Sequence, residues 1–138
     1  VTLREEKLAA QVERFPEARV DRIPAPGLVE LIESGNAESA EAYAMAEKLL
    51  APYAGKLDAL VLGCTHYPFA KKAITRALGE KTILLDGSEG TARQTRRRLE
   101  QAGLLYEGPG EVQMENSSAK RELLTLSMAL LEQKEMEA

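Results

Sequence analysis

The sequence has very little of several residue types that small proteins use for stability or for chemistry. Its 138 residues include no tryptophan, one cysteine and one histidine. A single cysteine cannot form a disulfide within the chain, so nothing indicates an oxidising compartment and a cytoplasmic location is expected. No apolar run approaches the roughly 20 residues of a membrane helix, and no signal-peptide pattern opens the chain, so we expect no membrane partner.

The overall charge is acidic, and this limits the partners that we expect. The formal net charge is −4, whereas proteins that bind nucleic acids favour basic surfaces. Arg93, Arg96 and Arg97 share one side of a predicted helix, but no aromatic residues are interleaved, so a solvated helix face explains them better. We therefore expect no nucleic-acid partner. A small anionic substrate held by backbone N–H groups stays compatible with the composition.

Enough apolar residues are present for a folded core. They make up 44% of the chain, against 29% charged and only 4% aromatic residues, so the core is expected to be aliphatic. The length fits one domain or two small lobes. The first residue is Val1 rather than methionine, and the abrupt opening VTLREEKL predicts a segment of a longer protein.

Short apolar runs alternate with longer amphipathic segments. Helices are predicted over residues 3–15, 28–33, 37–50, 68–79 and 89–102, and from a cap at Ser117 or Ser118 onward, while strands are predicted over 18–23, 58–62, 82–85 and 111–114. The runs at 58–62 and 82–85 are continuous and apolar, which suits parallel strands covered on both faces. The pattern predicts an α/β fold with a mainly parallel sheet and flanking helices. Residues 103–118 are the best candidate for a hinge.

The stretch LVLGCTHYPF, at residues 60–69, contains the only cysteine and the only histidine. Cys64 follows a predicted strand, at the edge of the sheet where α/β proteins bind ligands. A helix is predicted to begin near Pro68, and its N-terminus favours a thiolate and a bound carboxylate nearby. His66 is placed to exchange a proton with the thiol. Gly63 leaves room for a substrate to approach the backbone.

Simpler roles for this cysteine and histidine stay open, whereas several chemistries lack the residues that they need. A lone cysteine at the end of a strand is often a small buried hydrophobe, and a lone histidine in a loop is often only solvated. A structural zinc site needs about four ligands, and a thioredoxin-like site needs a second cysteine. A Cys–His hydrolase usually takes its histidine from a distant segment, and no phosphate-binding glycine loop is present.

The motif LVLGCTHYP resembles the second cysteine motif of glutamate racemases, in the aspartate/glutamate racemase family. Three further segments resemble that family in the same order, namely VTLREEKL at the start, APGLVELIESG at 25–35 and LLDGSEGTARQTRRRL at 84–99. The resemblance spans essentially the whole chain, but only the C-terminal half of a usual family member. Aspartate racemases tend toward Cys-Thr-Glu at this motif, so the Cys-Thr-His sequence disfavours them.

The resemblance implies a cofactor-independent inversion of the α-carbon of glutamate by two thiols, one on each face, which supplies D-glutamate for peptidoglycan. Cys64 matches the second thiol, His66 the histidine that assists it, and Thr65 a residue that binds the substrate carboxylate. Glu33 matches an acidic residue near that histidine. However, Glu33 also shares a helix face with Glu30, and a solvated acidic face would explain both.

The resemblance also implies how the chain is divided. Residues 1–86 are expected to form most of the second α/β lobe, and residues 87–138 to return and pack on the first lobe. That N-terminal lobe, with the first cysteine, lies outside this sequence, so the chain alone is not expected to racemise glutamate. Its leucine-rich last helix is expected to dock elsewhere or to favour a homo-oligomer. The alternatives are a non-enzymatic or split-chain lobe, and an aspartate racemase. Ala25 and Glu30 depart from the family pattern at positions without a chemical role.

Overall fold

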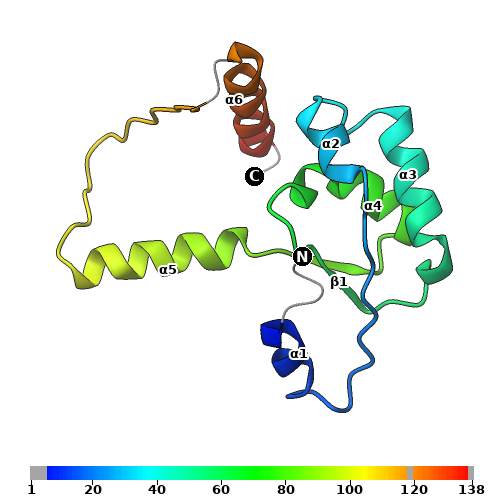
Figure 1. Cartoon of the computed structure of the whole chain (residues 1–138). Coiled ribbons are helices and arrows are strands. Elements are labelled where there is room, and N and C mark those ends of the chain that lie inside the picture. The colour runs from blue at the N-terminus through cyan, green and yellow to red at the C-terminus, as the bar shows by residue number, and fades with distance from the viewer. Residues whose placement is uncertain (1–5, 118–119, 137–138) are drawn as a thin grey trace.

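The computed structural model describes residues 6–117 and 120–136 (Figure 1). Its elements, in chain order, are α1 (Glu6–Val12), α2 (Leu28–Glu33), α3 (Ala40–Leu50), η2 (Ala51–Tyr53), β1 (Ala59–Val61), η3 (Tyr67–Ala70), α4 (Lys71–Leu78), β2 (Ile83–Leu85), α5 (Ser88–Gln101) and α6 (Arg121–Met136), where η marks a 3₁₀ helix.

The sheet consists of β1 and β2, which pair in parallel with Leu60 opposite Leu84. The connection between them runs through η3 and α4, so this part of the chain is a β–α–β unit, as parallel pairing requires. The predicted α/β class with a parallel sheet and flanking helices is confirmed.

Each strand is buried on one face only, which corrects the prediction that both faces are covered. Leu60 and Leu84 pack against the core. On the opposite face Val61 is 69% exposed and Ile83 is 61% exposed. The core elements α2, α3 and α4 pack on the side of Leu60 and Leu84. The described lobe therefore leaves apolar side chains on the other face of these strands exposed.

The core is aliphatic, as the composition predicts. Its largest fully buried side chain is that of Ile32 on α2. Ile32 belongs to one cluster with buried apolar residues from α2, the loop before α3, α3, the position after β1, η3 and α4, which are Leu28, Ala37, Leu50, Leu62, Ala70, Ile74 and Leu78. Ala42 and Ala46 present small, almost fully buried faces where α3 packs against α4, which lets the two helices approach closely.

Local signals explain where the helices begin and end. Gly27 precedes α2 with a φ of 86°, a conformation that glycine adopts without strain, and an added Cβ would lie 3.1 Å from Met45 Cε. Helix α3 begins later than predicted, because the Ser39 hydroxyl accepts a hydrogen bond from the Ala42 N–H at 3.2 Å. Ser39 is therefore its N-cap. Helix α4 ends at Leu78, and Gly79 follows as its C-cap, as predicted.

Two predicted strands are wrong. Residues 18–23 and 111–114 form no strand, because a strand needs a neighbour to bond its backbone, and within the described residues neither segment has one. Directly after the first segment, Pro24 and Pro26 also lack the backbone N–H that a strand donates. Helix α1 is described only from Glu6, so the predicted start near Leu3 lies outside the described residues, as does the candidate cap Ser118.

Helix α5, which follows β2, is set apart from the lobe, whereas α6 returns to it. Helix α5 has no buried residue and projects away from the lobe, and residues 102–117 follow it without helix or strand (Figure 1). Helix α6 lies near α2, with the Leu126 side chain close to Gly35. Among the described residues, no helix combines the length and the apolar character needed to cross a membrane.

Candidate active site

The candidate site lies at the carboxyl end of β1. Cys64 follows the last residue of this strand by three positions, and the chain then turns into η3 and α4. The turn is closed by the Tyr67 N–H, which donates to the Cys64 carbonyl at 3.3 Å, and by the Phe69 N–H, which donates to the His66 carbonyl at 3.0 Å. Pro68 lies in the first turn of η3, as predicted, where its missing N–H costs nothing.

Three predicted residues form a continuous chain of contacts. Cys64 Sγ lies 3.7 Å from His66 Nδ1, and His66 Nε2 lies 3.0 Å from Glu33 Oε1. Glu33 is the last residue of α2, so helix packing brings it to the histidine from 33 positions away in sequence. Glu33 thus contacts the histidine directly, which a merely solvated acidic face does not require.

The order of donors in this chain follows from the chemistry of the groups. A carboxylate accepts hydrogen bonds, so the neutral imidazole donates its Nε2–H to Glu33. Nδ1 is then left as an acceptor facing the thiol of Cys64. An imidazole oriented by a carboxylate in this way is held in one tautomer and one ring orientation. The arrangement can take a proton from Cys64 and return it.

The pair between His66 and Glu33 is open to solvent. Their side chains are 35% and 56% exposed. Ion pairs in such positions contribute on the order of 0–1 kcal/mol to stability. The contact between His66 and Glu33 therefore orients the imidazole for proton transfer and adds little to the stability of the fold.

The other two predicted residues flank the thiol. Gly63 and Thr65 are both exposed, and a Cβ added to Gly63 would meet no atom within 4 Å. The Thr65 hydroxyl makes no hydrogen bond to a residue that the structure describes. A ligand could therefore approach the backbone on one side of Cys64 and a hydroxyl on the other.

Tyr67 belongs to the surroundings of the site but is not among the predicted site residues. Burial, and then the negative charges of Cys64 and Glu30, raise the pKa of Tyr67 above its ordinary value. Glu30 lies one helical turn before Glu33 on α2, so both carboxylates of this helix act on the loop. Tyr67 lies in the quoted motif, directly after the histidine, but its spacing carries no separate signal.

A second polar group lies at the end of the neighbouring strand. Asp86 follows β2, and its side chain is only 12% exposed. Its carboxylate contacts Lys71 Nζ at 2.7 Å and accepts the Ser88 N–H at 2.8 Å. The hydrogen bond from Lys71, and then those from Ser88, hold the pKa of Asp86 well below the usual carboxyl range. Sequence reasoning missed this pair, because its two residues are 15 positions apart and belong to different elements.

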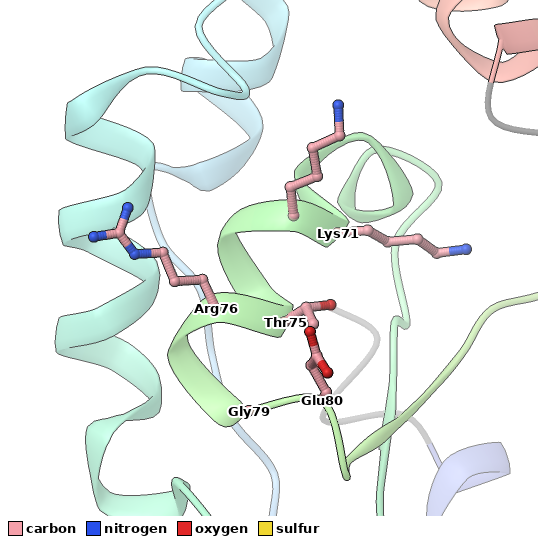
Figure 2. A pocket seen from close by; sticks show the side chains of 6 residues that line it. Lys71, Thr75, Arg76, Gly79 and Glu80 are labelled. Carbon is pink, nitrogen blue, oxygen red and sulfur yellow. The ribbon is translucent and has the colours of Figure 1, made fainter.

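An open hollow on α4 is distinct from the cysteine site. It is lined by Lys71, Lys72, Thr75, Arg76, Gly79 and Glu80 (Figure 2). Arg76 reaches toward α3 in Figure 2, where its guanidinium lies 5.1 Å from the centre of the Tyr43 ring. Lys72 pairs with Glu38 at 2.7 Å. Because these cations already have partners, and neither the cysteine nor the histidine lines the hollow, the chemistry points to Cys64 instead.

No metal centre is found in the described part of the chain, since no three histidine, cysteine, aspartate or glutamate side chains within residues 6–117 and 120–136 gather closely enough to hold an ion.

Curated relatives support the resemblance to glutamate racemases. No protein-family model matches the chain. The glutamate racemase of Clostridium perfringens is 41% identical over 135 residues, which cover 95% of this chain and 52% of the relative. The glutamate racemase of Clostridium kluyveri is 38% identical over 136 residues, covering 96% of this chain and 53% of the relative. The chain therefore spans about half the length of the curated relatives that it matches.

Solved structures agree with this assignment. Glutamate racemase from Thermus thermophilus, in complex with beta-chloro-D-alanine, superposes with a TM-score of 0.62 at 38% identity, over 75% of this chain and 41% of that chain. The Francisella tularensis enzyme, in complex with D-glutamate, gives a TM-score of 0.73 over 90% of this chain and 48% of that chain, at 23% identity, and supports the fold alone. The fold is that of one lobe of an α/β amino-acid racemase. The chain is related to the glutamate racemase family and corresponds to about half of a member's length.

Proposed function

We propose that this chain supplies one side of the active site of a glutamate racemase, with Cys64 acting on one face of the α-carbon. The observation that carries the proposal is the chain of contacts from Cys64 through His66 to Glu33 at the carboxyl end of β1. The similarity to glutamate racemases, which extends over almost the whole chain, supplies the reaction class.

The proposed reaction transfers one proton on each face of the glutamate α-carbon. In one direction the Cys64 thiolate removes the α-proton of glutamate, becoming a thiol, and leaves a carbanion stabilised by the adjacent carboxylate. A second thiol then delivers its own proton to the opposite face and becomes a thiolate. In the other direction Cys64 is the acid. His66, oriented by Glu33, accepts or returns the Cys64 proton between turnovers. No cofactor enters these steps.

Substrate binding is proposed for the residues beside the thiol. Thr65 offers a hydroxyl that makes no hydrogen bond within the described residues, and Gly63 leaves the loop backbone open. A hydroxyl and exposed N–H groups suit the carboxylate of an amino acid. These two residues would hold the substrate with its α-carbon near Cys64.

The second thiol must come from outside these 138 residues, because they contain one cysteine. We propose that residues 1–86 form the second lobe of the racemase and that residues 87–138 pack on the first lobe. The exposed state of α5 supports this division, and so do the exposed Leu104 and Tyr106 after it. The chain alone would then be unable to racemise glutamate, and association of identical chains would compete with lobe pairing.

The cellular role follows from the proposed reaction. A cytoplasmic racemase that makes D-glutamate would serve peptidoglycan synthesis and thus cell-wall formation and cell shape. A non-enzymatic or split-chain lobe is the alternative favoured by the single cysteine and the half-length match.

A chimera tests the proposal. Residues 1–138 would replace the matching segment of the Clostridium perfringens relative, and racemisation of D- and L-glutamate would be followed by circular dichroism. We expect racemisation by the chimera and its loss in Cys64→Ala. A folded chimera that leaves both enantiomers unchanged would point to the non-enzymatic alternative. Turnover of aspartate in preference to glutamate would assign the other substrate.

A further inference from the structure

The loop that holds Cys64 and His66 is attached at both ends to the end of β2. At its start the Leu62 N–H donates to the Leu85 carbonyl at 2.7 Å. At its end Lys71, the first residue of α4, places Nζ 2.7 Å from Asp86 Oδ2. The two residues that hold the loop, Leu85 and Asp86, are therefore consecutive. Both ends of the loop are fixed at the carboxyl end of β2.

The second attachment is more than a solvated surface pair. Asp86 is 12% exposed, although Lys71 is 45% exposed. The other oxygen of Asp86 accepts the Ser88 N–H at 2.8 Å, which fixes the orientation of the carboxylate. The low pKa of Asp86 agrees with this geometry, since hydrogen bonds to the charged form favour that form.

The pair lies close to the proposed chemistry without contacting it. Lys71 directly follows η3, the short helix that begins one residue after His66. Movement of the start of α4 would therefore move η3 and change how the Cys64 thiol faces the imidazole. Because Glu33 is held on α2, a displaced loop would also separate His66 from its carboxylate.

We propose that Lys71 and Asp86 are a positioning pair, which closes the catalytic loop so that Cys64 faces His66. The proposal rests on the proposed function only for what the alignment achieves, which is proton transfer by Cys64. The alignment itself does not depend on that function. In this proposal neither Lys71 nor Asp86 contacts the reacting atoms, and both act by holding the loop in place.

A positioning role and a simple effect of charge predict opposite patterns. If the charges acted on the thiol directly through space, removing the Lys71 cation would disfavour the thiolate, and removing the Asp86 anion would favour it. If the pair positions the loop, removing either partner misaligns Cys64 and His66, so both changes act in the same direction. The signs of the two effects therefore separate a positioning role from a direct effect of charge.

The experiment measures the rate of Cys64 alkylation by iodoacetamide in the full 138-residue chain at neutral pH. With one cysteine and one histidine, the signal is unambiguous. We expect Lys71→Met and Asp86→Asn each to lower the rate by about threefold or more, toward the rate of His66→Ala. Lys71→Arg is expected to restore it. The asparagine keeps an oxygen for the Ser88 N–H, so it removes the charge with little change of shape.

Lys72→Met is the matched control. It removes an ion pair of the same length, with Glu38, from the next residue of the same helix, and it is expected to leave the alkylation rate within about twofold. Far-UV circular dichroism checks that each variant is folded. Rates that rise, that stay unchanged, or that move in opposite directions in Lys71→Met and Asp86→Asn would overturn the proposal.

The assay involves no glutamate, so its outcome is independent of racemisation. An unchanged rate in His66→Ala would count against the assistance of Cys64 by His66 and hence against the proposed function. A lowered rate in His66→Ala with unaltered rates in the Lys71 and Asp86 variants would count against the positioning pair alone.

Discussion

Replacing Ile32 with alanine is expected to be severely destabilising. The Ile32 side chain is 0% exposed, and the change removes three carbon atoms. Each buried carbon contributes about 0.8 kcal/mol through the hydrophobic effect, and the cavity left behind adds to this loss. We therefore expect the free energy of unfolding to fall by about 2–5 kcal/mol. For a domain with a total stability of about 5–15 kcal/mol, this is a large share.

The assay is urea unfolding followed by far-UV circular dichroism, with two comparisons. Ile32→Val removes one carbon and is expected to cost about 0.5–1.5 kcal/mol. Ile83→Ala makes the same chemical change at a side chain that is 61% exposed. It is expected to change the free energy of unfolding by no more than about 0.5 kcal/mol, because exposed positions away from special features tolerate change.

An equal loss in Ile83→Ala and Ile32→Ala would refute this reasoning. It would mean that the outer face of β1 and β2 is covered in solution, by another copy or by another segment. Stability that depends on protein concentration would identify a second copy as the cover, because association then contributes to unfolding.

Two further predictions concern single contacts. Ser39→Ala removes the hydroxyl that accepts the Ala42 N–H and is expected to lower the free energy of unfolding by about 1 kcal/mol in the same urea assay, whereas an unchanged midpoint would contradict the cap. Because the pKa of Asp86 is lower when folded, its ionic contacts stabilise the fold above the ordinary carboxyl pKa of about 3.9 and lose this effect as the pH falls further. The stability difference between the chain and Asp86→Asn should therefore shrink between pH 6 and pH 2, and a difference that is constant with pH would contradict it.

Features set by local sequence could be predicted well. The strand before Cys64, the helix that ends just before Gly79, and the short helix 28–33 each follow from apolar runs bounded by glycine or proline. The closeness of Cys64 and His66 is also local, because only one residue separates them in the sequence. The same holds for the aliphatic core, which follows from the scarcity of aromatic residues.

Features that depend on distant neighbours could not be predicted from the residues alone. Residues 18–23 have strand-like composition but lack a partner strand, and Val61 is apolar although its face of the sheet is exposed. The contact from Glu33 to His66 was expected only through the family resemblance. The pair of Lys71 and Asp86 was missed, because it depends on how α4 returns beside β2.

The central claim is that Cys64 serves one face of the glutamate α-carbon, and α-proton exchange tests it most directly. The chimera and its Cys64→Ala variant would be incubated in D₂O with D- or L-glutamate, and loss of the α-proton signal would be followed by NMR. We predict exchange of both enantiomers by the unaltered chimera. In the Cys64→Ala variant we predict exchange of only the enantiomer whose α-proton faces the other thiol. Exchange of both enantiomers at undiminished rates in that variant would contradict the claim.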